Sequence, residues 1–132
     1  MFINENFYKA NLGVMRVKRI VANIKTENIA AAQRFYGEVL GLEKMMDHGW
    51  IETYGNEYSM PLQISFASQG GSGTDVPDLS IEVDDIETAY SKMKEFGFTI
   101  TYGPVDEVWG VRRFYVRDPF GKLVNILMHI AH

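Results

Sequence analysis

Hydrophobic positions along the chain change period several times, and these changes predict a mixed α+β structure. Alternation from Arg16 to Lys25 predicts a strand. Helical spacing follows from Ile29 to Leu40, with Asn28 as the expected N-cap and Gly41 as the helix end. Shorter apolar runs separated by glycine-containing turns predict three more strands, at 42–48, 50–54 and 60–67.

The second part of the chain repeats this series of elements. A strand at 79–83 precedes a predicted capping box in which Asp84 and Glu87 take the paired roles. The helix after it ends at Gly97, and a strand is predicted at 98–102. The last two strands flank Asp118-Pro119-Phe120-Gly121, whose composition is typical of a tight turn.

The two series align as an internal repeat. Ile24-Lys25-Thr26-Glu27-Asn28-Ile29 aligns with Ile81-Glu82-Val83-Asp84-Asp85-Ile86, and Leu62-Gln63-Ile64 aligns with Val124-Asn125-Ile126. The larger offset of the second pair is expected to reflect a longer loop at 105–110. One such half cannot cover both faces of its own sheet, so we expect the two halves to share one. The predicted parts are an extension 1–15, a first module 16–68, a Gly/Ser-rich linker 69–77 and a second module 78–132.

Composition narrows the classes of function. With 46% hydrophobic and 23% charged residues in 132, one packed domain is expected. The net charge of −4 gives no electrostatic reason to expect nucleic acid. The absence of cysteine excludes disulfides, thiolate catalysis and cysteine metal sites. Without a signal peptide pattern or an apolar run of about 20 residues, we expect a cytoplasmic protein that does not enter the membrane.

Several motifs occur together in one order. They are Phe35-Tyr36-Gly37-Glu38-Val39-Leu40-Gly41-Leu42-Glu43, then the Ile81 to Ile86 segment, Trp109-Gly110 and the Asp118 to Gly121 turn. On these motifs the chain, from about 16 to 129, resembles the vicinal oxygen chelate superfamily, also called the glyoxalase/bleomycin-resistance/dioxygenase family. Its form Trp-Gly-x-Arg-Arg-Phe is most similar to the bleomycin-resistance branch. The resemblance implies two tandem βαβββ modules whose curled mixed sheets surround a shared cleft, and a homodimer.

The resemblance also implies where metal ligands would stand. Metal-dependent members keep His, Gln or Glu on the first and last strands of each module, and the repeat places these positions at Val21, Gln63, Asp78 and Asn125. Valine cannot coordinate a metal, and the neutral amides are weak ligands for transition metals. None of the three histidines stands at these positions. We therefore expect no metal and no cofactor.

A cleft without a metal remains the default site for a small molecule. Candidate ligand-binding residues share strand faces with the four positions or lie near the expected cleft mouth: Asn23, Trp50, Gln63, Ser65, Asp78, Ser80, Trp109, Arg113 and Asn125. Each polar candidate has the alternative of a hydrogen-bonded core group, and Trp109 has the alternative of filling the core. The arginines have the alternative of pairing with Asp106, Glu107 or Asp118, which we favour for Arg117.

Four functional hypotheses follow. The first is a metal-independent binding protein that sequesters a planar amphipathic compound, as bleomycin-resistance proteins do with an antibiotic. The second is a divalent-metal-dependent lyase, epimerase or dioxygenase of the same superfamily, for which the ligand set is missing. The third is a metal-free enzyme in which a buried Asp78 acts as general base. A structural or protein-interaction role is the fourth.

Overall fold

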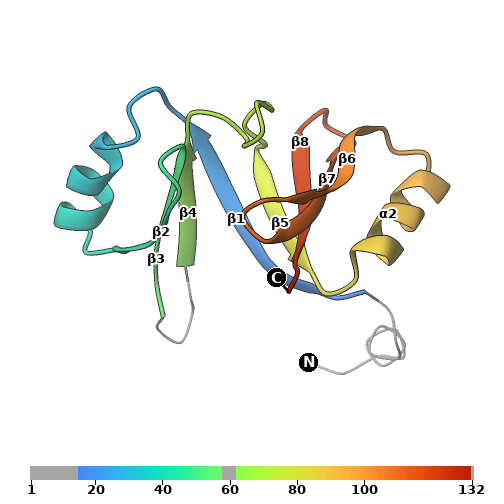
Figure 1. Ribbon diagram of the computed structural model, residues 1–132. Coiled ribbons are helices and arrows are strands. Elements are labelled where there is room, and N and C mark those ends of the chain that lie inside the picture. The colour runs from blue at the N-terminus through green and yellow to red at the C-terminus, as the bar shows by residue number, and fades with distance from the viewer. Residues whose placement is uncertain (1–14, 58–61, 132) are drawn as a thin grey trace, which may run out of the picture. The chain divides into compact units, whose positions relative to one another are not determined.

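The computed structural model describes residues 15–57 and 62–131, which form eight strands and two helical segments (Figure 1). The predicted α+β class is confirmed. In hydrogen-bonded order the strands are β2-β3-β4-β1-β5-β8-β7-β6, an unclosed sheet. The elements are β1 (Val17–Lys25), η1 (Gln33–Val39), β2 (Glu43–Asp47), β3 (Ile51–Asn56), β4 (Leu62–Ala67), β5 (Leu79–Val83), α2 (Ile86–Glu95), β6 (Ile100–Glu107), β7 (Val111–Arg117) and β8 (Leu123–His129).

The internal repeat reappears in the topology. Each half places its first strand beside its last, followed by its third and its second, as β1-β4-β3-β2 and as β5-β8-β7-β6. The chain divides into two compact units. The first unit is Val21–Leu79, and the second unit is the start of β1 up to Ile20 together with the chain from Ser80 onward. The module boundaries given above and the shared cleft stay predictions.

Tyr54 lies at the centre of the first unit. Its side chain is fully buried with Ala32 and Phe66, and Tyr36 and Ile64 pack against this cluster. Its hydroxyl donates a hydrogen bond to Oε1 of Glu52 at 2.8 Å. Burial and this carboxylate together raise the pKa of the Tyr54 phenol from 10.0 to about 12.

The first helical segment begins later than predicted. Residues 29–30 form a turn that leads into a short helical start at 31–32, in which Ala31 N–H donates to Asn28 O and Ala32 N–H donates to Ile29 O. Asn28 is not the N-cap of the π-helix η1, which starts at Gln33 with Ala32 at the cap position and no side-chain cap hydrogen bond. The Thr26 hydroxyl accepts a hydrogen bond from Asn28 N–H at 2.9 Å. The predicted end is confirmed at Gly41, which has φ +76°.

The predicted capping box before α2 is wrong by one residue. The N-cap is Asp85, whose carboxylate accepts hydrogen bonds from Thr88 N–H at 3.0 Å and the Thr88 hydroxyl at 2.7 Å. Asp84 is engaged elsewhere, because its Oδ1 accepts from Arg16 N–H at 2.8 Å and its own N–H donates to Arg16 O at 3.1 Å. Either Asp84 or Asp85 could cap the helix. Asp84 is hydrogen-bonded to Arg16 just before β1, so Asp85 becomes the cap.

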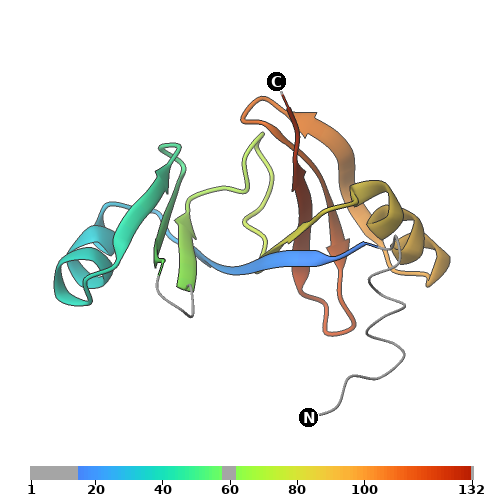
Figure 2. The same cartoon turned by 90° about the horizontal axis from the view of Figure 1, so that it is seen from below.

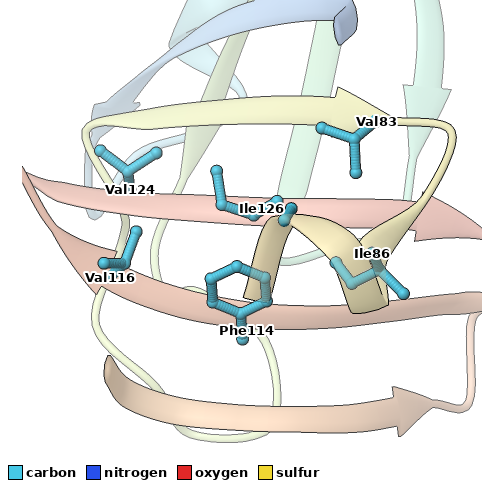
Figure 3. Packing of buried hydrophobic residues seen from close by; sticks show 7 residues of the cluster. Val83, Ile86, Phe114, Val116, Val124 and Ile126 are labelled. Carbon is cyan, nitrogen blue, oxygen red and sulfur yellow. The ribbon is translucent and has the colours of Figure 1, made fainter. Parts of the chain in front are cut away.

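The core of the second unit lies between α2 and one face of β5, β7 and β8 (Figures 2 and 3). The buried side chains of this cluster come from alternate strand positions and from two turns of the helix: Val83, Ile86, Ala89, Phe114, Val116, Val124 and Ile126. Phe114 is fully buried and meets the Tyr90 ring edge-on, at 5.4 Å between centroids. Because strand side chains alternate, the residues between these positions point away from α2.

Glu82 joins three strands of the second unit. Its carboxylate accepts hydrogen bonds from Arg19 Nε at 2.9 Å and from the His129 ring at 3.0 Å, and Lys18 Nζ lies 3.7 Å away. Burial alone raises the pKa of this carboxyl, but the His129 hydrogen bond and the charges of Arg19 and Lys18 outweigh it and hold the pKa below its ordinary 4.5.

No helix in 15–57 or 62–131 combines the length and apolar character that a membrane crossing requires.

Replacing Glu82 by Gln is expected to remove acid-dependent stability. A carboxyl whose folded pKa is depressed stabilises the fold above its unfolded pKa, and this stabilisation is lost as the pH falls through the folded pKa. Wild type should therefore exceed E82Q by about 1 kcal/mol near neutrality, and the difference should shrink below pH 4.5. Urea unfolding at several pH values measures this, and a difference independent of pH would contradict it.

Tyr54 is expected to ionise near pH 12 in the folded protein, because its pKa is raised to about 12. The unfolded chain ionises there from about pH 10, so stability should fall between these two values. Ultraviolet titration of wild type and Y54F tests this, with circular dichroism reporting the fold. A single ionisation step near pH 10 in folded wild type would rule the prediction out.

Candidate functional site

The face of the second unit turned away from α2 carries a line of polar and aromatic side chains. Tyr102 on β6 is opposite Tyr115 on β7, and Tyr115 is opposite Asn125 on β8. Asn125 Nδ2 then donates a hydrogen bond to Ser80 Oγ on β5 at 3.1 Å. These four residues are called the polar row, and they come one each from β5, β6, β7 and β8.

Asn125 is the member of the polar row with incomplete hydrogen bonding. Its side chain is 8% exposed, and its Oδ1 is buried without a hydrogen-bond partner among the described residues. A buried acceptor left without a donor costs about 1–3 kcal/mol. The amide oxygen is therefore a place where a bound donor would be stabilised.

Beside the polar row, Arg113 is held inside a cage of aromatic rings. It is 2% exposed, its Nε and Nη2 both lie 2.7 Å from Glu107 Oε2, and its Nη1 donates to the Tyr115 hydroxyl at 2.9 Å. The guanidinium carbon lies 5.4, 5.0 and 4.9 Å from the ring centroids of Tyr102, Trp109 and Tyr115. The charge of Arg113 is thus neutralised within the protein.

An irregularity in β6 brings Tyr102 and Glu107 to the same face. In a regular strand two residues five positions apart point to opposite faces. Here the register shifts between Tyr102 and Val105, so that one extra residue of β6 is accommodated. The Tyr102 hydroxyl can therefore donate to Glu107 Oε2 at 2.9 Å. Gly103 permits this shift, because it has φ +76° and a Cβ there would lie 2.5 Å from Arg113 O.

The structure corrects the predicted loop at 105–110. β6 continues to Glu107, with Val105 opposite Arg113, and only 108–110 form the turn. Trp109 lies in this turn, partly buried, with its ring against the Arg113 guanidinium. Sequence reasoning did not single out Tyr102 or Tyr115. The alternation of Tyr115 with Arg113 was the available signal, whereas the shift in β6 left none for Tyr102.

An acidic partner was favoured for Arg117 from the sequence, but the structure gives acidic partners to Arg112 and Arg113. Arg113 has the acidic partner, and Arg112 pairs with Asp106 and with Glu87 on the other face of β7. Arg117, for which such a partner was favoured, instead donates from Nη1 to Gly121 O at 3.1 Å. The reason is the register, which puts Asp106 opposite Arg112 and leaves Arg117 beside the turn.

The first unit holds a second buried amide oxygen, Oδ1 of Asn23, beside a Ser65 hydroxyl that has a partner within the protein. The Ser65 and Thr53 hydroxyls lie 2.7 Å apart, and Asn23 stands beside Ser65 in the β1–β4 register with its own amide oxygen buried. Gln63 Nε2 lies 3.9 Å from the Met45 sulfur. Trp50 is partly buried, and its ring stacks with His48 at 6.1 Å between centroids.

Asp78 departs from the general-base hypothesis. That hypothesis required a buried carboxyl, but the Asp78 side chain is exposed. Its backbone oxygen accepts a hydrogen bond from Asn23 N–H at 3.0 Å, which is a structural role. Exposure keeps the carboxylate hydrated, so the burial that the hypothesis required is missing.

A family model described as Glyoxalase/Bleomycin resistance protein/Dioxygenase superfamily matches residues 16–126. The chain belongs to this superfamily. The family recognised from the sequence motifs is thereby confirmed, while the match does not distinguish the bleomycin-resistance branch. No curated protein sequence matches the chain.

Solved structures confirm the superfamily fold. A superfamily member from Vibrio splendidus 12B01 is 18% identical with a TM-score of 0.58, and the match covers 87% of this chain and 100% of that one. Methylmalonyl-CoA epimerase from Mycobacterium tuberculosis is 13% identical with a TM-score of 0.56, covering 87% and 88%. A protein from Legionella pneumophila titled NAD-dependent benzaldehyde dehydrogenase is 15% identical with a TM-score of 0.66, covering 84% and 99%. At these identities the likeness concerns the fold alone.

The positions at which superfamily enzymes would keep a metal do not fit one here. Val21 is an apolar side chain with 5% exposure, and the Asn125 amide nitrogen is engaged by Ser80. Asp78 supplies one exposed carboxylate. Across 15–57 and 62–131, no group of three or more His, Asp or Glu side chains is arranged to hold a metal ion. The donor set is therefore too neutral and too sparse for a divalent metal.

Replacing Arg113 by Gln is expected to destabilise the fold by about 3–5 kcal/mol, because it leaves the Glu107 carboxylate buried without its cation. The matched control is R112Q, on the next residue of the same strand, whose ion pairs are solvent-exposed. Urea unfolding of both variants measures the difference. The two substitutions should differ clearly, with R112Q close to wild type, and equal losses would refute the structural role of Arg113.

Proposed function

We propose that this superfamily member is a metal-independent small-molecule binding protein that sequesters a planar amphipathic compound, such as an antibiotic. The observation that carries the proposal is the buried Asn125 Oδ1 without a partner among the described residues. A closed protein core disfavours such an atom, whereas a binding site uses it when the ligand arrives.

The neighbours of Asn125 support a flat, partly apolar ligand. The Tyr102 and Tyr115 rings lie 5.2 Å apart between centroids in the adjoining positions of the polar row. Each ring is held by its hydroxyl: Tyr102 donates to Glu107, and Tyr115 accepts from Arg113. Fixed aromatic rings bind planar compounds with little loss of side-chain entropy.

The chemistry of the metal positions favours binding over the metal-dependent alternatives. A lyase, epimerase or dioxygenase of the metal-dependent type needs two or more strong ligands with an open coordination position. Val21 and the Ser80-bound Asn125 do not supply them. The proposal names no catalytic residue, since Asp78 is exposed. It includes a homodimer and a cytoplasmic location, both carried over from the sequence interpretation.

The test is fluorescence titration of EDTA-treated protein with a panel of planar antibiotics and dyes. The W50F variant leaves Trp109 as the sole tryptophan, beside the Arg113 cage. We expect at least one compound to change Trp109 emission with the same affinity before and after EDTA. Mass spectrometry of protein purified without chelator should find no tightly bound metal.

Two results would overturn this function. One is about one equivalent of tightly bound divalent metal that ligand binding requires. The other is a panel in which no compound changes the emission of W50F or of wild type.

A further inference from the structure

We infer that the ligand of the polar row is uncharged and donates a hydrogen bond, from an N–H or O–H group on a planar ring system, to Oδ1 of Asn125. This inference rests on the proposed function and narrows its ligand class. Three features of the face carry it: the orientation of the Asn125 amide, the neutralised charge of Arg113 and the engaged carboxylates.

The orientation of the amide sets the polarity of the site. Asn125 Nδ2 donates one of its two N–H groups to Ser80 Oγ at 3.1 Å, so the donor side of the amide has a partner within the protein. The side that remains is Oδ1, which is buried and accepts hydrogen bonds only. A ligand N–H or O–H satisfies it, whereas an ether oxygen or a carboxylate placed there meets another acceptor.

The state of Arg113 selects against an anionic ligand. Its Nε and Nη2 are 2.7 Å from Glu107 Oε2, and its Nη1 donates to Tyr115. Its guanidinium also lies against three aromatic rings. Binding an anion would require breaking a buried ion pair and exposing Glu107 as an uncompensated charge, which is strongly unfavourable. The geometry therefore does not favour Arg113, a ligand-binding candidate from the sequence, as the partner of an anionic group.

The carboxylates of the same unit select against a cationic ligand. Glu107 accepts from Arg113 and from the Tyr102 hydroxyl. Glu82 is held by Arg19 and His129 and has a pKa below its ordinary value, so it is charged and compensated by these protein groups. A cation on this face would have to displace a protein cation from one of them.

On the β7 side of Asn125, the side chains of the polar row are aromatic. Tyr115 stands directly opposite Asn125 across β7 and β8, and Tyr102 follows in the same line. A planar donor such as a phenol, an indole or a ring lactam meets both requirements at once: a flat apolar body and one polar hydrogen.

The inference is tested by comparing three probes on wild-type protein: indole, benzothiophene and indole-2-carboxylate. Benzothiophene keeps the shape of indole and lacks its N–H, and the carboxylate keeps the N–H and adds a negative charge. Protein-observed NMR gives each affinity, and the Asn125 side-chain amide signal reports occupancy of the site. We expect indole to bind about tenfold more tightly than benzothiophene, because a buried acceptor is satisfied by only one of them. Indole-2-carboxylate should bind no more tightly than indole.

The variant N125L should abolish the preference for indole over benzothiophene. The matched control is N28L, the same substitution at an exposed asparagine outside the face, which should leave the preference unchanged. If N125L does not fold, the affinities of indole and benzothiophene for wild-type protein still test the donor requirement. Equal affinity of indole and benzothiophene, or tighter binding of the carboxylate, overturns the donor requirement while the binding function stands. If none of the probes binds and the antibiotic panel also fails, both proposals are wrong.

Discussion

The ion pair between Arg113 and Glu107 is the interaction on which the candidate site depends. Both side chains are almost fully buried, so their charges have lost hydration that only close contact with each other and with other polar groups can replace. The Tyr102 and Tyr115 hydroxyls supply those contacts, and three aromatic rings surround the guanidinium. Each ring is therefore fixed by electrostatics as well as by packing. The polar row inherits this order, because two of its four members belong to the cage.

The fold was largely accessible from the sequence. Period-two alternation predicted the strands. The aligned segments around Ile24 and Ile81 predicted two similar halves, and the strand order shows the same topology in both. Local details were less accessible where two residues compete for one role. Asp84 and Asp85 are both good caps, and only the tertiary pairing with Arg16 decides between them. Before η1, the Thr26 hydroxyl accepts a hydrogen bond from Asn28 N–H, and the helix itself starts later, at Gln33, without a side-chain cap.

The candidate site was accessible only in part. The repeat pointed to Asn125, but not to the shift in β6 that aligns Tyr102 with Glu107, because a bulge interrupts the very period from which faces are predicted. The halves also differ in a way that register alone reveals. Gly55 stands opposite Gln63 where the second half has Tyr115 opposite Asn125, and the Ser65 hydroxyl pairs with Thr53. A tyrosine beside the amide is therefore found only in the second half at this pair of aligned positions.

Gly103 gives this arrangement an unusual dependence on a residue without a side chain. Its positive φ and its approach to Arg113 O leave no space for a Cβ. Any other amino acid would push β6 away from β7 and would separate Tyr102 from Glu107. In a population of variants, changes at Gly103 should therefore be poorly tolerated for a reason that involves no ligand. Such a signal would reflect the spacing between two strands, and it should not be mistaken for contact with a bound molecule.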